Sequence, residues 1–186
     1  MSDAGEASGR SDSAWLACVD VDYRGDLAVA GCVLFERWED AAPAATRVEV
    51  VHGVAAYRSG HFAERELPAL LAVLASAPSL AAVVVDGFVW LAPGVPGLGG
   101  HLFERLERAV PVVGVAKRGR PGLERDAPIA RAVLRGRSAR PLWVSAAGMA
   151  LDDAVAAVER MHGEHRLPTL LKSVDSLART WLPPGS

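Results

Sequence analysis

The segment LACVDVDY, residues 16–23, alternates apolar and polar side chains as a half-buried strand does. Val19 and Val21 lie on one face of this strand, and Asp20 and Asp22 lie on the other. The following Arg-Gly-Asp is a turn signal, and two more Val-rich segments, residues 27–36 and 47–56, come after it. Three successive strands with short connections predict an antiparallel meander.

Downstream of this meander the spacing of apolar residues changes to that of a helix. Leucines recur at helical spacing within residues 65–77, and short apolar runs follow at residues 80–87 and 110–117. Such runs, separated by a helical segment at residues 99–108, are typical of parallel strands covered on both faces. A further strand is expected at residues 141–146, and an amphipathic helix at residues 152–165. The order predicts one α/β domain over residues 15–186, with three antiparallel strands and then parallel strands in a mixed sheet flanked by helices. Residues 1–14 are expected to be a disordered tail.

Composition excludes several classes of protein. The chain has 186 residues, 51% hydrophobic and 23% charged, which is enough to bury a core and excludes a disordered or fibrous chain. No apolar run approaches the roughly 18 residues of a membrane-spanning helix, and the first fifteen residues lack the apolar stretch of a secretory signal. Cys18 and Cys32 lie in apolar strands as free thiols would, so a cytoplasmic location is expected.

Charge is distributed unevenly along the chain. Residues 1–100 contain 6 Arg and 13 acids, whereas residues 101–186 contain 14 Lys and Arg and 9 acids. Residues 117–140 alone hold 8 cations, and a field of this kind favours a polyanion such as nucleic acid. A solvated Arg-rich loop is the alternative interpretation.

Three acids stand where the strand and helix patterns would favour other residues. Asp20 lies inside an apolar strand, and Asp86 ends the run VVVD, at the edge where α/β sheets bind ligands. Glu66 lies in the first turn of the intervening helix. Together they could bind Mg²⁺, which prefers oxygen ligands and supports phosphodiester hydrolysis. Singly, they could favour a helix N-terminus, form an Asp-Gly turn or pair with an arginine.

In these motifs the chain resembles the endonuclease V family, the deoxyinosine-directed repair nucleases with an RNase H-like fold. The resemblance extends over residues 17–177, and its anchors are VDVDY (19–23), RELPALL (65–71), VVVDG (83–87), VPVVGVAK (110–117) and RPLWVSAAG (140–148). It implies that Asp20, Glu66 and Asp86 bind the catalytic metal, Mg²⁺ or Mn²⁺. It also implies that Lys117 is catalytic and contacts the nucleic acid.

The resemblance further implies four residues for binding the nucleic acid. Tyr57 matches the tyrosine of the loop that wedges into the strand, and Gly60, Gly97 and Gly114 match glycines whose backbone approaches the extruded base. Their alternative roles are a strand end for Tyr57 and turns for the glycines.

The chain also departs from the family pattern at several positions. The family's Asp-Gly-His reads Asp86-Gly87-Phe88, its following histidine-proline begins with Ala92, and its late Gly-His reads Gly148-Met149. The expected function is therefore a monomeric, metal-dependent endonuclease that cuts near deoxyinosine in DNA, with reduced or altered activity because a thioether replaces the imidazole. The alternatives are an inactive nucleic-acid-binding or interaction protein and a nuclease redirected to inosine-containing RNA.

Overall fold

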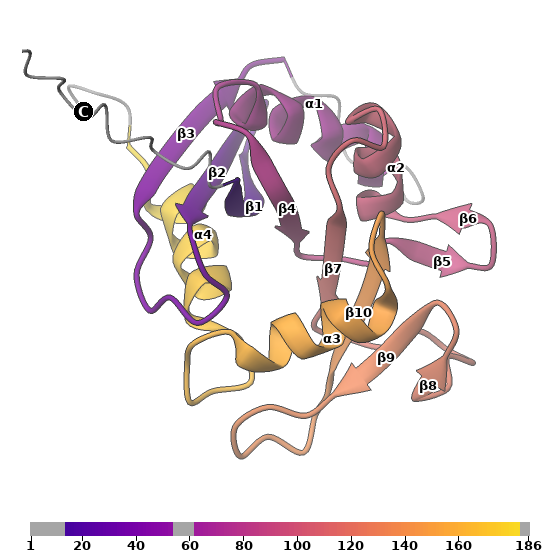
Figure 1. The fold of residues 1–186 in the computed structure, drawn as a ribbon. Coiled ribbons are helices and arrows are strands. Elements are labelled where there is room, and N and C mark those ends of the chain that lie inside the picture. Colours follow the sequence, from indigo (N-terminus) through magenta and orange to yellow (C-terminus); the bar gives the residue numbers. More distant parts are fainter. Residues whose placement is uncertain (1–13, 54–61, 183–186) are drawn as a thin grey trace, which may run out of the picture.

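The computed structural model describes residues 14–53 and 62–182, and its strands form one large sheet and one small hairpin (Figure 1). The eight-stranded sheet has the order β3-β2-β1-β4-β7-β10-β9-β8. Its strands are β1 (Trp15–Arg24), β2 (Leu27–Phe35), β3 (Ala45–Val51), β4 (Leu80–Val85), β7 (Val112–Ala116), β8 (Asp126–Ala127), β9 (Ala130–Val133) and β10 (Leu142–Ala147). The hairpin consists of β5 (Trp90–Ala92) and β6 (Val95–Pro96).

The strand directions confirm the mixed α/β sheet. Strands β1, β2 and β3 form the antiparallel meander, while β1, β4 and β7 run parallel to one another in the centre. The central runs LAAVVV and VVGVA can be apolar almost throughout because helices cover both faces of a parallel sheet. Strand β10 then pairs antiparallel with β7.

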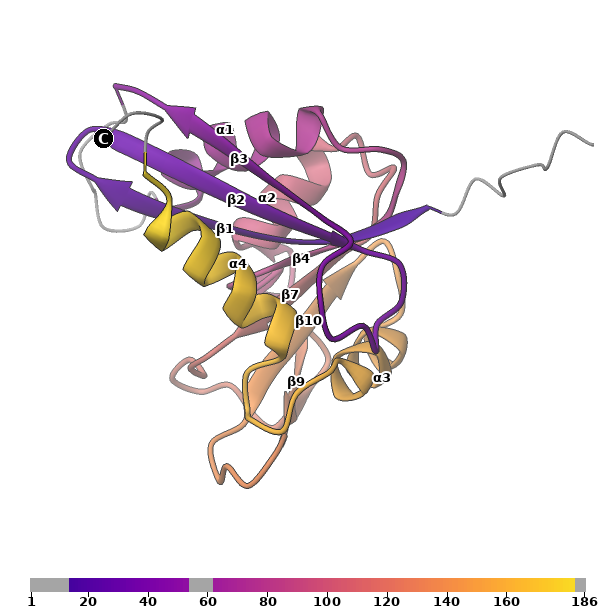
Figure 2. The same ribbon diagram turned by 90° about the vertical axis from the view of Figure 1, so that its left-hand side faces the viewer.

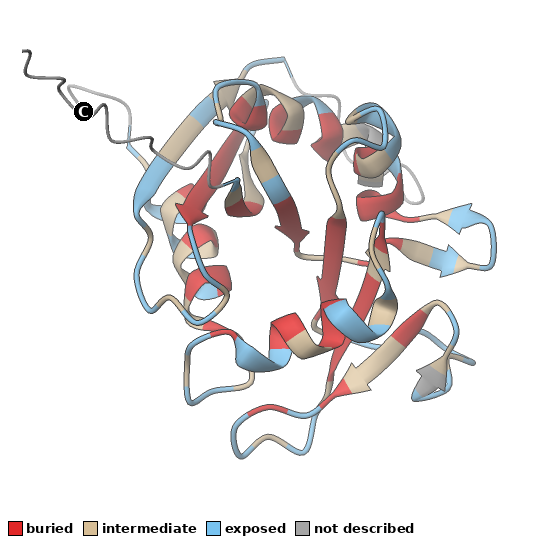
Figure 3. Cartoon of the chain, viewed as in Figure 1, coloured by how far each residue is buried: buried red, intermediate tan, exposed pale blue. Residues whose placement is uncertain are grey.

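Helices cover both faces of the sheet (Figures 2 and 3). Helices α1 (Phe62–Ala75) and α2 (Leu98–Arg105) pack on one face, against the cluster that includes Ala17, Val19 and Val85. Helices α3 (Leu151–Arg160) and α4 (Thr169–Thr180) pack on the other, against the cluster that includes Cys18 and Val84. Neighbouring residues of β1 therefore serve opposite cores, as the two-residue period of a strand requires.

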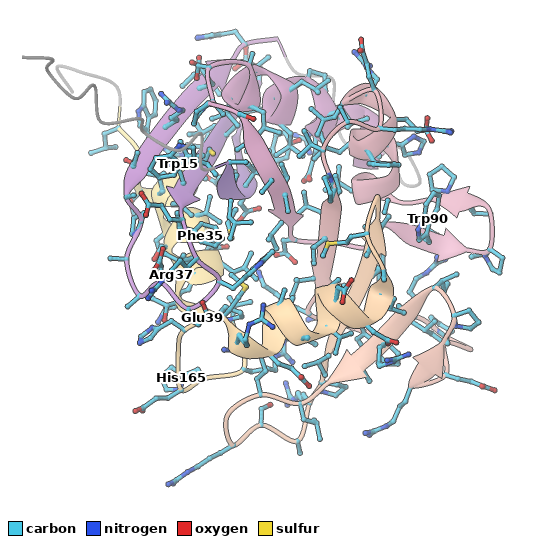
Figure 4. The ribbon with its side chains drawn as sticks, viewed as in Figure 1. Trp15, Phe35, Arg37, Glu39, Trp90 and His165 are labelled. Carbon is cyan, nitrogen blue, oxygen red and sulfur yellow. The ribbon has the colours of Figure 1, made fainter. Side chains whose placement is uncertain are left out.

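Several boundaries differ from those expected. The helix predicted to reach residue 165 ends at Arg160, and Gly163 adopts a positive φ of 124° in the bend that follows. Helix α4 follows that bend and was not expected. The β5–β6 hairpin and strands β8 and β9 lie in segments for which no strand was predicted. Trp90, labelled in Figure 4, anchors the hairpin by donating its indole N–H to the Ala146 carbonyl at 2.9 Å.

The predicted tail lies almost wholly outside the described residues, as do the last residues of the third predicted strand, 54–56. None of the described helices combines the length and the apolar character needed to cross a membrane.

Candidate active site

Asp20 and Asp86 lie at the same level of two adjacent parallel strands. Val19 of β1 pairs with Val85 of β4, and the residue that follows each of these valines is an aspartate. Asp86 follows the last residue of β4, where ligands bind in α/β sheets. Lys117 follows the last residue of β7, the next strand in the sheet.

These side chains open on one pocket of about 260 Å³. The three predicted carboxylates and Lys117 all line it. Four further residues from β1 and α4 complete the lining: Val21, Asp22, Asp175 and Arg179. Glu66 reaches the pocket from the first turns of α1, on the face of the sheet opposite α4. The structure therefore brings together Asp20, Glu66 and Asp86, which are remote in sequence.

The carboxylates converge on the pocket without forming a ready coordination shell. Among residues 14–53 and 62–182, no three His, Cys, Asp or Glu side chains are arranged to hold a metal ion as they stand. Instead, Lys117 Nζ lies 2.5 Å from Asp86 Oδ2, and both side chains are about one-third exposed. Burial lowers the pKa of Lys117, but the hydrogen bond and the charge of Asp86 outweigh it and raise that pKa overall.

Burial and mutual repulsion raise the pKa of two of the carboxyl groups and so favour their protonated forms. The pKa of Asp20 rises to about 6, first through burial and then through the nearby charge of Asp86. The pKa of Glu66 rises to about 8, first through burial and then through the charges of Asp20 and Asp86. Asp20 lies beside a small hollow with apolar lining residues, which contribute to its burial: Val19, Val115, Leu167, Leu171 and Val174.

This electrostatic conflict predicts an unusual pH dependence of stability. An acid whose pKa is raised by folding binds more protons in the folded state, so the free energy of unfolding falls as the pH rises through that range. In EDTA, we expect the free energy of unfolding to fall by at least about 1 kcal/mol between pH 5 and pH 8.5, since one pKa unit corresponds to about 1.4 kcal/mol. Glu66→Gln should remove much of this loss in thermal unfolding, because glutamine carries no charge.

Glu159→Gln is the matched control, since Glu159 is exposed on α3. It should leave the pH dependence as in the wild type. If the stability of Glu66→Gln falls with pH as steeply as that of the wild type, folding does not raise the pKa of Glu66.

Asp175 is the pocket residue that the sequence analysis missed. It lies in the middle of α4, and its side chain is 25% exposed and accepts a hydrogen bond from Arg179 at 3.0 Å. Its charge contributes to the raised pKa of Asp20. The apolar spacing of Leu170, Leu171, Val174 and Ala178 could have revealed the helix. An acid four residues after Leu171 would then have been placed near the buried face.

The donor set suits a hard cation. Five carboxylates line one open pocket, two from β1 and one each from α1, the end of β4 and α4. A divalent ion among them would offset the repulsion that raises the pKa of Asp20 and Glu66. Oxygen ligands with room for several waters are what Mg²⁺ requires. No histidine is among the lining residues in the part of the chain that the structure describes.

Met149, expected to weaken the site, lies away from it. Ala147 of β10 pairs with Val112 at the beginning of β7, whereas Lys117 follows the other end of β7. Residue 149 is thus at the opposite edge of the sheet, where Met149 packs against the core under α3 and α4. Any effect of the missing imidazole on the pocket would have to be transmitted through the sheet.

The other candidate residues fall into two groups. Gly97 and Gly114 are packed tightly: a Cβ at Gly97 would lie 2.4 Å from the Phe88 carbonyl oxygen, and one at Gly114 would lie 2.5 Å from that of Gly87. Both glycines therefore have a packing reason, since they let residues 87–89 lie against α2 and β7. Tyr57 and Gly60 lie outside the described residues.

The fold and the pocket define an α/β protein with an acidic, solvent-open site at the carboxyl ends of its central parallel strands. The chain belongs to the endonuclease V family, which it matches over residues 4–176. No curated protein matches it.

Among solved structures, endonuclease V from Streptomyces avermitilis is 28% identical, with a TM-score of 0.69, over 90% of this chain and 81% of that one. Human endonuclease V is 25% identical, with a TM-score of 0.72, over 91% and 84%. The Ciona intestinalis enzyme, in complex with DNA containing an inosine followed by a ribo-adenosine, is 22% identical, with a TM-score of 0.74, over 89% and 84%. These similarities confirm the expected fold.

Proposed function

We propose that this protein is a monomeric, divalent-metal-dependent endonuclease that hydrolyses a phosphodiester bond near deoxyinosine in DNA. The observation that carries the proposal is the convergence of Asp20, Glu66, Asp86 and Asp175 with Lys117 in one open pocket. Membership of the endonuclease V family supports the reaction type. The inosine-containing DNA bound by the Ciona relative supports the substrate.

The residues that line the pocket would have two roles, metal binding and stabilisation of charge. Asp20 and Asp86, level with each other on adjacent strands, would hold Mg²⁺ or Mn²⁺, with Glu66 and Asp175 as further oxygen donors. When bound, the ion would activate water and stabilise charge on the scissile phosphate. Lys117, at the rim beside Asp86, would face the phosphate oxygens and offset their charge.

Cations beyond the pocket fit a nucleic-acid backbone. Arg118, Arg120, Arg137 and Arg140 are exposed in the basic segment that follows Lys117. Arg120 is oriented by a 2.7 Å hydrogen bond to the Leu91 carbonyl of the β5–β6 hairpin. Phosphate contacts of this kind would position the substrate and make binding sensitive to salt. Tyr57 is proposed to wedge into the strand, and the backbone of Gly60, Gly97 and Gly114 to approach the extruded base.

A nicking assay tests the proposal directly. Matched oligonucleotides containing deoxyinosine or adenine are incubated with the protein in Mg²⁺, in Mn²⁺ and in EDTA, and an inosine-containing RNA forms a further arm. We expect cleavage only with inosine and metal, and none with Asp86→Ala. Cleavage that persists in EDTA or in Asp86→Ala would refute the proposed site.

Two outcomes would redirect the proposal. Cleavage confined to the RNA arm would identify an inosine-RNA nuclease. Salt-sensitive binding to both nucleic acids without cleavage in either metal would identify a binding protein. Phe88 fits that second outcome, since it replaces a family histidine with a side chain that is 9% exposed and packs with Ala116 and Trp143.

A further inference from the structure

Helix α4 lies across β1 and β2 and brings Asp175 to the pocket (Figures 1 and 2). A helix turns 100° per residue, so a small slip or rotation of α4 would carry Asp175 away from Asp20. The position of α4 along β1 is therefore critical if Asp175 belongs to the proposed metal site, and the present inference rests on that proposed function.

Arg24, the last residue of β1, holds the C-terminal end of α4. Its guanidinium donates to three backbone carbonyl oxygens at that end: Ala178 at 3.1 Å, Arg179 at 2.5 Å and Trp181 at 2.6 Å. The last carbonyls of a helix have no partner within the helix, and a cation there is favourable. Three directed hydrogen bonds from one planar group fix both the position and the rotation of the helix end.

Asp22 orients Arg24 from the same strand. The Arg24 Nε donates to Asp22 Oδ2 at 3.2 Å, and both side chains are 31% exposed. The two terminal nitrogens of Arg24 are thereby left directed at α4. This chain of contacts joins the strand that contains Asp20 to the helix that contains Asp175.

A second observation shows that α4 touches the sheet at the level of Asp20. Gly31 of β2 pairs with Asp20 of β1. A Cβ at Gly31 would lie 3.2 Å from the Val174 carbonyl oxygen and 3.3 Å from the Ala178 amide nitrogen. The turn of α4 that contains Asp175 thus packs backbone to backbone beside the residue opposite Asp20.

We propose that Arg24 is a positioning residue for the metal site, which fixes the register of α4 on β1 so that Asp175 faces the three predicted carboxylates. Gly31 permits the close approach, and Arg24 sets the helix along it. Arg24 itself is not among the residues that line the pocket.

Manganese affinity measured on the full chain tests this role. Titration with MnCl₂, followed by the electron paramagnetic resonance signal of free Mn²⁺, should show roughly 10-fold weaker binding for Arg24→Gln, as for other residues that orient metal ligands. Arg24→Lys keeps the charge but loses the planar fork, so its affinity should be intermediate. Gly31→Ala, which pushes on α4 from the sheet, should also weaken binding.

Arg160→Gln is the matched control. Arg160 pairs with Glu39 at 2.9 Å on the exposed surface at the end of α3, and Glu39 is labelled in Figure 4. This variant loses the same charge from a side chain outside the pocket lining, and its Mn²⁺ affinity should equal that of the wild type. Equal affinities for Arg24→Gln and Arg160→Gln would overturn the proposal.

A double-mutant cycle separates positioning from general stability. If Arg24 acts through Asp175, Arg24→Gln should not weaken Mn²⁺ binding further once Asp175→Asn is present. A full additional loss in the Asp175→Asn background would refute the role. Thermal unfolding of each variant identifies a protein that is not folded, and Arg24→Lys then replaces Arg24→Gln in the cycle.

Failure of the metal site would be recognised separately. A wild-type protein that binds no Mn²⁺ would refute the proposed function, and amide hydrogen exchange would then decide the role of Arg24. Amides in the last two turns of α4 should exchange faster in Arg24→Gln than in Arg160→Gln. Equal exchange would show that Arg24 does not hold the helix.

Discussion

Asp20→Asn is expected to slow metal-dependent cleavage of inosine-containing DNA by about 10³-fold or more, since loss of a metal ligand removes several kcal/mol of transition-state stabilisation. The substitution is nearly isosteric, and the asparagine oxygen can keep the 2.9 Å hydrogen bond from the Val21 amide. The same variant should be more stable than the wild type in EDTA. Burial and the charge of Asp86 raise the pKa of Asp20 to about 6. At higher pH an uncharged asparagine avoids both the desolvation of a carboxylate and its repulsion by Asp86.

The matched control is Asp26→Asn, in the exposed β1–β2 turn, which changes the net charge equally. Single-turnover cleavage and thermal unfolding of both variants, each with and without Mg²⁺, make the comparison. An Asp20→Asn protein that cleaves within tenfold of the wild type would show that the pocket is not the catalytic site. Lower stability in EDTA would contradict the electrostatic interpretation.

Lys117→Met is expected to move metal binding and catalysis in opposite directions. Removing the cation that lies 2.5 Å from Asp86 frees that carboxylate and ends a repulsion, so Mn²⁺ should bind at least about threefold more tightly. Cleavage should nevertheless slow by about 10²-fold or more, because the group that offsets charge on the phosphate is gone.

Lys172→Met is the control for this prediction. Lys172 is the other lysine of the chain and is exposed on α4, and it is not among the residues that line the pocket. Weaker Mn²⁺ binding by Lys117→Met would mean that the lysine supports the carboxylates instead of competing for Asp86. Unchanged cleavage would remove Lys117 from the proposed catalytic set.

Local patterns predicted much of the fold. The alternation of residues 16–23 and the apolar runs before Asp86 and Lys117 correspond to β1, β4 and β7, because burial on one or both faces constrains which residues a strand can hold. The same patterns placed two carboxylates at strand positions of one sheet. Their shared level depends on the register of Val19 with Val85, which side-chain spacing alone does not specify.

The predicted boundaries were weaker where apolar periodicity runs across a bend. The expected helix at residues 152–165 ends at Arg160, and residues 117–140, for which no strand was predicted, contain β8 and β9. Family resemblance directed attention to Met149, but the antiparallel course of β10 places that residue at the far edge of the sheet from the pocket. The direction of a strand depends on its pairing partner, which is not a local property.

The sequence by itself predicted the α/β class from its apolar spacing and three candidate acids from their unusual positions, and its resemblance to a family added the lysine. Only the tertiary structure brought Asp175 beside them and disclosed Arg24 and Gly31 as the contacts that set α4 on the sheet. The reason is physical: a pocket of like charges is a long-range arrangement. The electrostatic free energy of the pocket depends on burial and on distances between segments more than 100 residues apart. Neither quantity can be deduced from a single segment of the sequence.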